Sequence, residues 1–411
     1  MNQPLVLDPA DIEMPRGRPV DESQLPRMPE IPRRRYLDPA FFALELEHVW
    51  RKTWLLVAHE TEVPDVGSYR LLDFLEMAPV FLVRGKDRTV RAFLNSCQHR
   101  GATVLRAKEG CAKALSCQYH GWTYDLQGRL VGVTQEQTFP HLETGGRGLV
   151  ELRCEQWGGL VFINFDAKAP ALLDWMTPSV VKRYDAIHRH PMRVVWRQSW
   201  IFECNWKLPV EAFREAYHIE TVHKKTVAQM IDCMNARVEL NPNGHGTITV
   251  PYWPRQAMAA GEWDAVPTLS NLARVPGANV GELIEGVVEG NWFPNVSFAI
   301  QSVGFPIFTA WPIALDRTRV EALWLGVDWG DAPKSAEWEV LTAGSEVVAH
   351  EDLQNLTSIQ KSLAADPDKG IPLSTKEIAI YQLHAEIDKL IGAERVASHL
   401  RVPDLLARFE V

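Results

Sequence analysis

The sequence is poor in several features that mark particular classes of protein. Only six of its 411 residues are cysteines, too few for a disulfide-stabilised scaffold. Its 43 Lys and Arg residues are outnumbered by 52 Asp and Glu residues, and the net charge of −9 disfavours a protein that coats nucleic acid. No run approaches the roughly 18 apolar residues of a membrane span. The first residues lack the basic-then-apolar order of a signal peptide, so we expect a cytoplasmic protein with reduced or metal-bound thiols.

The composition is otherwise that of a folded protein, with 46% hydrophobic and 23% charged residues. The pattern along the chain predicts an α+β fold. A Pro-rich arm and a helix over residues 1–45 are expected to pack on the larger domain, and short strand-like runs predict a small all-β domain over 46–166. Residues 167–411 indicate a larger domain, a central antiparallel sheet flanked by helices. One helix is predicted over each of the ranges 205–235, 335–365 and 374–392.

A cysteine–histidine pattern lies between residues 97 and 120. It is Cys97-x-His99, a gap of 17 residues, then Cys117-x-x-His120, so each of two short loops carries one thiolate and one imidazole. Two Cys and two His suit tetrahedral zinc, but zinc spacings usually pair Cys with Cys and His with His. The mixed loops favour a [2Fe–2S] cluster in which one iron takes both thiolates and the other both imidazoles. The remaining cysteines lack partner spacing and are expected to be buried small residues: Cys111, Cys154, Cys204 and Cys233.

A second group of metal-ligating residues lies within 205–223. On a continuous helix, Glu211, Glu215 and His218 fall at i, i+4 and i+7 and share one face. His223 is five residues beyond His218, about 140° around an ideal helix. Both histidines could reach one ion only if the helix distorts or ends near residue 220, and a plain surface helix remains the alternative.

Asp352 supplies a third ligand of the right kind. It occupies an apolar helical stripe with Val348, Leu356, Ile359 and Leu363, and a carboxylate on a buried face should be paired or neutralised. Two histidines and one aspartate form a facial triad with open positions, the site of non-haem Fe(II) oxygenases. The neighbouring His350 and Glu351 point about 200° and 100° away on a helix and are not expected to be ligands.

These motifs resemble the large α subunits of the Rieske non-haem iron oxygenases over about residues 40–390. The matching stretches are Cys97-Gln-His-Arg-Gly, Cys117-Gln-Tyr-His-Gly-Trp-Thr-Tyr, Asn205-Trp-Lys, Glu215-x-Tyr-His218-x4-His223 and Glu351-Asp352. The resemblance implies that Cys97 and Cys117 hold one cluster iron, that His99 and His120 hold the other, and that His218, His223 and Asp352 bind a mononuclear iron. Glu215 matches the acidic residue that links the two centres between neighbouring subunits.

The resemblance also implies a function. The chain would be a terminal oxygenase component that activates O2 at Fe(II), with electrons relayed through the cluster, to mono- or cis-dihydroxylate an aromatic or other apolar organic substrate. Oxidative N- or O-demethylation is the alternative within the family. A Rieske electron carrier without catalysis and a zinc-stapled binding protein are remoter alternatives. The mononuclear site and the length of the chain disfavour the first, and the mixed Cys–His loops disfavour the second.

The resemblance further implies partners. The sequence has no Gly-x-Gly-x-x-Gly nucleotide fingerprint, so NAD(P)H must be oxidised by a separate reductase, directly or through a ferredoxin. A homotrimer is expected, with or without a separate small β subunit. One departure is Ala212, where many relatives carry Asn, and a second is that the linking acid is Glu where Asp is common.

The substrate pocket is less defined by the sequence. Phe213 and the alternating run 290–301 are expected to line it. That run could face the iron with Trp292 and Phe298, or with the opposite set of side chains. Few cationic residues occur there, which favours an apolar or aromatic substrate.

Overall fold

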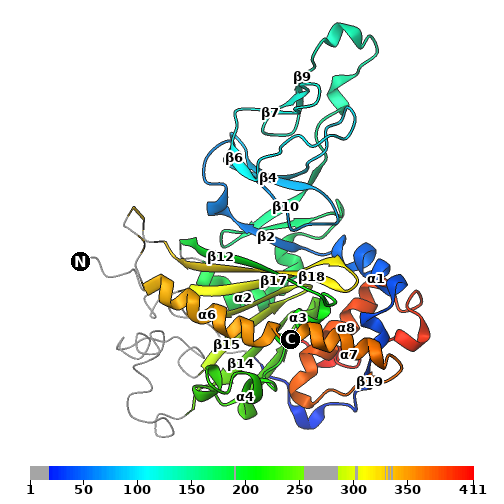
Figure 1. Ribbon diagram of the computed structural model, residues 1–411, viewed down its shortest axis with the longest axis vertical. Helices are drawn as coiled ribbons and strands as arrows, with labels where there is room; N and C mark the ends of the chain where they lie inside the picture. The colour runs from blue at the N-terminus through cyan, green and yellow to red at the C-terminus, as the bar shows by residue number, and fades with distance from the viewer. Residues whose placement is uncertain are drawn as a thin grey trace. The chain divides into compact units, whose positions relative to one another are not determined.

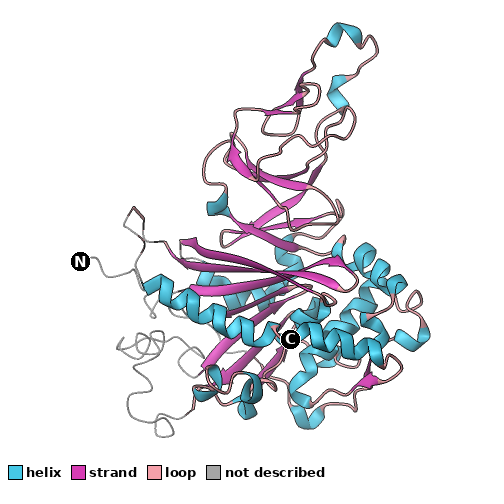
Figure 2. Cartoon of the chain, viewed as in Figure 1, coloured by secondary structure: helices cyan, strands magenta, loops and turns pink. Residues whose placement is uncertain are grey.

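The computed structural model describes residues 18–188, 191–253, 286–300, 304–328, 330, 331, 334 and 337–411. They form two compact units: Arg51–Leu172 is one, and Met1–Trp50 together with Leu173–Val411 is the other. The predicted boundaries at 45/46 and 166/167 fall a few residues earlier. The mixed α+β class is confirmed, since strands dominate the first unit and a sheet with helices makes up the second (Figure 2).

The smaller unit is built from two antiparallel sheets. The larger of them has the strand order β2-β11-β10-β5-β4-β3-β6, and the smaller has the order β7-β8-β9. Phe81, Phe93, Trp122 and Tyr124 belong to the apolar core that supports the second sheet. The strand bounds are β2 Leu55–His59, β3 Ser68–Leu71, β4 Val80–Arg84, β5 Val90–Leu94, β6 Glu109–Cys111, β7 Leu115–Ser116, β8 Thr123–Tyr124, β9 Leu130–Gly132, β10 Glu151–Trp157 and β11 Leu160–Asn164.

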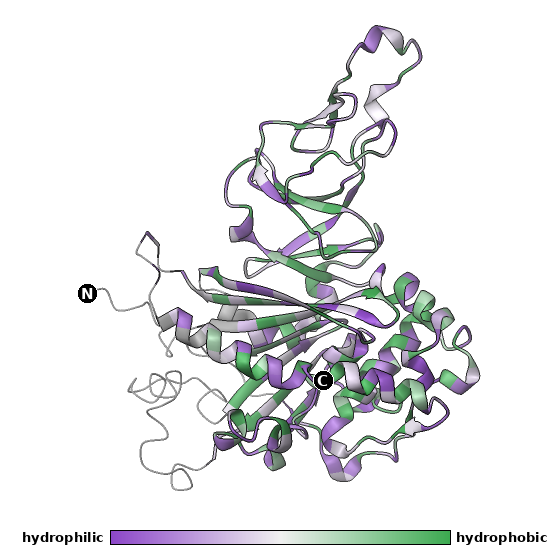
Figure 3. Cartoon of the chain, viewed as in Figure 1, coloured by the Kyte–Doolittle hydropathy of each residue, from purple (hydrophilic) through white to green (hydrophobic). Residues whose placement is uncertain are grey.

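The larger unit is organised around one seven-stranded antiparallel sheet, in the order β12-β18-β17-β16-β15-β14-β13 (Figure 1). Hydrophobic residues make up much of its strands (Figure 3). A two-stranded ladder, β1 with β19, joins the N-terminal segment to the C-terminal part of the unit. The strand bounds are β1 Ile31–Pro32, β12 Met192–Phe202, β13 Arg237–Leu240, β14 Gly246–Pro251, β15 Gly286–Trp292, β16 Val296–Ile300, β17 Gly304–Ala314, β18 Arg317–Val327 and β19 Gly370–Ile371.

Helices cover both faces of this sheet. Tyr184 of α2 packs edge-on against Trp292 and Phe298, with ring centroids 5.7 and 5.2 Å apart. On the opposite face Phe213, directly after α3, stacks on Phe308 at 4.8 Å. No helix within the described ranges is both long and apolar enough to cross a membrane. The helix bounds are α1 Pro39–Glu45, α2 Leu172–His188, α3 Lys207–Ala212, α4 Ile219–Val222, α6 Glu337–Leu353, α7 Leu356–Ala365 and α8 Ile378–Ile391.

The predicted single helix over 205–235 is wrong. The structure has α3 and α4 separated by an irregular turn at 213–218, followed by the 3₁₀ turn Val227–Gln229. The Glu215 carboxylate accepts hydrogen bonds from the backbone N–H groups of Tyr217 and His218. A side chain that caps the following N–H groups favours the start of a new helical turn over the continuation of the old one.

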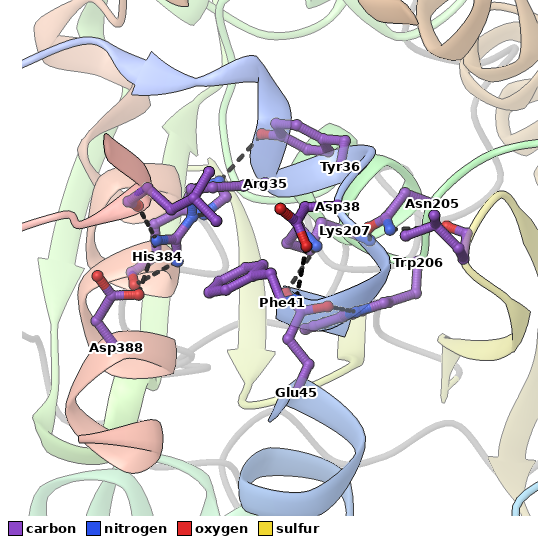
Figure 4. Close-up of polar contacts among 12 residues, drawn as sticks. Arg35, Tyr36, Asp38, Phe41, Glu45, Asn205, Trp206, Lys207, His384 and Asp388 are labelled. Atoms are coloured by element: carbon purple, nitrogen blue, oxygen red, sulfur yellow. Dashed lines mark hydrogen bonds and ion pairs between the residues drawn. The ribbon is translucent and has the colours of Figure 1, made fainter. Parts of the chain in front are cut away.

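Buried ionic groups hold the N-terminal segment to the rest of the larger unit (Figure 4). Arg35 donates to Asp388 Oδ1 at 2.7 Å and to the ring of His384 at 2.9 Å. Lys207 Nζ lies 2.7 Å from Glu45 Oε1, and both side chains have no exposed surface. Asp38 caps α1 by accepting from the N–H groups of Ala40 and Phe41. This network fixes α1 against α3, the helix that leads to Glu215 and His218.

Candidate metal centres

The two cysteine–histidine loops of the smaller unit have the same backbone design. The Cys97 N–H donates to Ala102 O, and the Cys117 N–H donates to Trp122 O, both at 2.8 Å. Gly101 and Gly121 then turn back toward the two cysteines with φ of 75° and 71°, a conformation that suits glycine. Each loop therefore presents a cysteine and a histidine on the same side, at the tip of a tight turn.

The four side chains meet in two pairs, histidine with histidine and cysteine with cysteine. Nδ1 of His99 lies 3.1 Å from Nδ1 of His120, and the buried thiols of Cys97 and Cys117 interact with each other. Burial and the neighbouring Cys117 raise the pKa of Cys97, although a hydrogen bond with Tyr124 opposes this shift. A buried thiol with a raised pKa keeps its proton until a cation binds and stabilises the thiolate. The donor set of two sulfurs and two ring nitrogens fits a mixed-ligand iron–sulfur cluster.

Two aromatic residues outside the ligand pattern support this cluster of side chains. Trp122 stacks on the His99 ring, with centroids 5.0 Å apart and planes at 11°. The Tyr124 hydroxyl lies 3.2 Å from Cys97 Sγ and accepts from the Gln98 N–H. The sequence analysis assigned neither of them a role, although both stand in the stretch that carries the second loop. Hydrogen bonds near cluster sulfurs tune reduction potentials.

The other cysteines form no disulfide and stand apart from this site. Cys204 and Cys233 are buried as predicted, and Cys154 is half-buried. The prediction for Cys111 is wrong, since its side chain is exposed on β6. The physical reason is that β6 is the edge strand of its sheet and all three of its residues face solvent.

In the larger unit, His218, His223 and Asp352 come together although 129 residues separate His223 from Asp352. One ligand atom from each lies within 4.8 Å of the others. Nε2 of His218 is 3.2 Å from Asp352 Oδ1, and Nε2 of His223 is 2.8 Å from the same oxygen. The helical break before α4 makes this possible, because the two histidines flank that short helix and are not on one long one. The donor set suits a divalent transition metal with open positions.

Each histidine is held from behind by a carboxylate. Nδ1 of His218 lies 2.5 Å from Glu215 Oε1, and Nδ1 of His223 lies 2.8 Å from Glu351 Oε2. The Thr226 hydroxyl donates to the same Glu351 oxygen at 2.7 Å. Such carboxylates fix the ring orientation and leave Nε2 available to a metal. The sequence analysis did not expect Glu351 to be a ligand, and its carboxylate lies against Nδ1 of His223 and not among the three ligand atoms. Helical angles alone could not predict this contact with His223.

The electrostatics of this group favour a bound cation. Burial opposes a charge on His218, but hydrogen bonds with Asp352 and Glu215 raise its pKa to about 10. Burial also opposes a charge on Asp352 and by itself would raise its pKa. Hydrogen bonds with the two histidines nevertheless hold the pKa of Asp352 below its usual value. A metal cation bound by these atoms takes the place of the protons that the histidines otherwise retain.

The structure separates the three candidate pocket residues. Phe213 lies on the sheet face that carries the His–His–Asp group, stacked on Phe308. Trp292 and Phe298 lie on the other face, packed on Tyr184 of α2 and buried. Alternation along β15 and β16 explains this, since the residues on the face of the His–His–Asp group are the opposite set. Ala212 ends α3 next to Phe213 and is half-buried.

Comparisons with known proteins agree with the two sites. Residues 181–393 match the family model described as ring hydroxylating alpha subunit (catalytic domain), and residues 53–144 match the Rieske [2Fe-2S] domain. Biphenyl 2,3-dioxygenase subunit alpha of Rhodococcus jostii (strain RHA1) is 38% identical over 193 residues, 46% of this chain and 42% of that protein. The chain thus spans less than half of the length of that relative. The 2-aminobenzenesulfonate 2,3-dioxygenase subunit alpha of an Alcaligenes species is 29% identical over 299 residues, 72% of this chain and 73% of that protein.

Solved structures share the fold. Naphthalene 1,2-dioxygenase from a Rhodococcus species, bound to indole, superposes with a TM-score of 0.73 at 22% identity, over 89% of this chain and 95% of that one. The quaternary ammonium Rieske monooxygenase CntA gives a TM-score of 0.73 at 20% identity, over 90% of this chain and 99% of that one. At these identities the similarity establishes the architecture.

Proposed function

Because this chain belongs to the family of ring-hydroxylating α subunits, we propose that it is the terminal oxygenase component of a Rieske-type oxygenase. It would hydroxylate an aromatic or other apolar organic substrate, by adding one oxygen atom or two. The family implies two cofactors, a Rieske [2Fe-2S] cluster and a mononuclear iron. The convergence of His218, His223 and Asp352 on one point is the observation that carries the proposal.

The ligand roles follow from the two donor sets. Cys97 and Cys117 would hold one iron of the cluster, and His99 and His120 the other. His218, His223 and Asp352 would hold the mononuclear iron, with Glu215 and Glu351 keeping the two rings in place. When bound, these groups supply the stored electron and the O2-activating metal that oxygenation needs. With the metal bound, Glu215 and Glu351 would each accept a hydrogen bond from an Nδ1–H group, which leaves the Nε2 lone pair of each ring for the metal.

We propose that partners supply the electrons. An NAD(P)H-dependent reductase, directly or through a ferredoxin, would reduce the cluster, because the sequence has no nucleotide fingerprint of its own. A homotrimer would let Glu215 link the mononuclear site of one subunit to a cluster histidine of the next. Glu215 is suited to this because its carboxylate already holds the His218 ring and two backbone N–H groups.

The Glu215→Gln variant tests this link. We expect the variant to retain both iron centres and to oxidise its cluster about 10- to 100-fold more slowly in a single turnover. The reason is that the glutamine amide is neutral and lacks the negative charge that the Glu215 carboxylate places beside the His218 ring. Stopped-flow absorbance of the reduced cluster after mixing with O2 and substrate measures the rate. Glu220→Gln, an exposed residue of α4, removes the same charge and should leave the rate unchanged. An unaltered rate in Glu215→Gln would remove Glu215 from electron transfer.

Metal and product analysis test the proposed function as a whole. The purified protein should carry iron and acid-labile sulfide, with the visible absorption of a Rieske cluster. A product screen with reductase and O2, followed by mass spectrometry, then distinguishes the reactions: two oxygens and two hydrogens gained indicate a diol, one oxygen gained indicates a hydroxylation, and a lost methyl group indicates demethylation. Zinc without sulfide would overturn the proposal.

A further inference from the structure

The sheet face that carries the candidate iron ligands retains accessible surface in its centre. Along β15, Val287 and Glu289 are half-buried, whereas the alternate residues Val288 and Gly290 are buried. The neighbouring strands repeat this on the same face, because Ala299 and Phe308 are half-buried while Phe298 and Ile307 are buried. Strand register makes Ala299 the direct cross-strand neighbour of Glu289. Four side chains on three adjacent strands therefore share one face of the sheet and keep part of their surface accessible.

Glu289 is the ionisable residue among these four. Its cross-strand neighbours, Ile248 on β14 and Ala299 on β16, offer it no polar group from their side chains. Within the part of the chain that the structure describes, no hydrogen bond or ion pair joins Glu289 to another residue. A carboxyl group in apolar surroundings without a partner is costly, so its presence needs a reason.

The charges around Glu289 belong to the candidate iron site. Those that act on it most strongly after its burial are His218, Asp352, Glu215 and His223, and no lysine or arginine is among them. Burial, together with Asp352 and Glu215, raises the pKa of Glu289 to about 7, against the opposing effect of the two histidines. Glu351 adds a further carboxylate behind His223. Even beside a divalent iron, the carboxylates of Asp352, Glu215, Glu351 and Glu289 leave an excess of negative charge on this face, which repels an anionic substrate group and attracts a cationic one.

The same face also carries an aromatic wall. Phe213 and Phe308 stack with planes at 12°, and both are half-buried. Phe308 lies on β17, two strands from Glu289 on β15, a separation of about 10 Å across the sheet. A cation held between a carboxylate and aromatic rings is stabilised by both.

We infer that Glu289 is a substrate-recognition residue and that the substrate is an organic cation, with a protonated or quaternary nitrogen directed at Glu289 and its apolar part against Phe213 and Phe308. This rests on the proposed function and narrows its substrate class to aromatic or otherwise largely apolar molecules that carry one cationic nitrogen. The carboxylate does not ligate iron and moves no proton in the reaction. It orients the substrate by charge.

An isosteric pair of probes tests the inference on the full-length protein with both iron centres loaded. Phenyltrimethylammonium and tert-butylbenzene have the same shape and differ by one charge, and benzoate supplies the opposite charge. Calorimetry should show that the cation binds about tenfold more tightly than the neutral isostere, a ratio equal to roughly 1.4 kcal/mol, with benzoate weakest. The Glu289→Gln variant should bind the cation no more tightly than the neutral isostere, while its affinity for tert-butylbenzene should equal that of the wild-type protein.

Three controls make each outcome decisive. Glu220→Gln removes one exposed charge and should keep the preference for the cation. The cluster absorption and the thermal midpoint of Glu289→Gln report whether the variant is folded, and Glu289→Asp should retain part of the preference. Equal binding of the two probes by the wild-type protein, or a preference that survives in Glu289→Gln, would overturn the inference. Missing iron or sulfide in the same sample would instead contradict the proposed function.

Discussion

Replacing Asp352 with alanine is expected to abolish product formation while the visible spectrum of the cluster stays intact. Asp352 Oδ1 lies within 3.2 Å of Nε2 of both His218 and His223, so its removal takes away one of three metal donors and the charge that balances them. Loss of supporting residues alone costs metal sites about 10- to 100-fold in affinity or activity, so loss of a ligand should cost more than about 100-fold. Iron content, cluster absorbance and turnover are the measurements.

The matched control is Asp331→Ala, an exposed aspartate of the larger unit. It should keep full iron content and full turnover. The expected iron loss in Asp352→Ala is confined to the mononuclear site, because Cys97, His99, Cys117 and His120 belong to the other compact unit. Retained turnover in Asp352→Ala would show that this aspartate is not a ligand. Loss of the cluster spectrum would show that the substitution disturbs the whole protein and not the site alone.

Replacing Lys207 with methionine is expected to lower the free energy of unfolding by about 3–5 kcal/mol. The ammonium of Lys207 and the carboxylate of Glu45 lie 2.7 Å apart with no exposed surface. Removal of one partner leaves a buried charge uncompensated, which is far costlier than removal of both. Lys207 also lies 5.3 Å from the ring centroids of Tyr36 and Trp206, and those contacts are lost as well. Urea unfolding of the larger unit, followed by tryptophan fluorescence, measures the effect.

Two comparisons separate charge burial from lost packing. The double variant Lys207→Met/Glu45→Gln should recover part of the loss, because the amide introduced in place of the Glu45 carboxylate is neutral and its oxygen can still accept from Trp206. Lys369→Met breaks an exposed pair with Asp366, and it should cost less than about 1 kcal/mol. A Lys207→Met variant as stable as the wild-type protein would mean that the pair contributes nothing.

The loss in Lys207→Met should also depend on pH. Burial already raises the pKa of Glu45 above its ordinary value of 4.5, and without Lys207 the pKa rises further. The folded variant then holds a proton that the unfolded chain releases above pH 4.5, so its stability falls as the pH rises above that value. The deficit should therefore be smallest below pH 4.5 and should grow toward neutral pH.

Local spacing made the cluster site predictable. Each loop closes within six residues through two backbone hydrogen bonds to its own cysteine, so Cys97 with His99 and Cys117 with His120 are paired by the chain itself. The same local rule failed between residues 205 and 235. There the helix stops at Ala212, since Glu215 bonds to the N–H groups of Tyr217 and His218, and helical periodicity could not anticipate this competing side-chain cap.

The sequence by itself determined the types and order of the candidate ligands and the α+β class, because these follow from residue chemistry and short-range periodicity. Only the tertiary structure decided which groups meet across long stretches of chain. It brings Asp352 to His223, sets Glu351 behind that ring, and turns Trp292 and Phe298 to the far face of the sheet. Among the described residues, it also leaves Glu289 without a hydrogen-bond partner and under the electrostatic influence of the candidate iron ligands. Strand register decides which face of the sheet a side chain occupies, and helix packing decides which residues become its neighbours. Both depend on contacts between residues that lie far apart in the sequence.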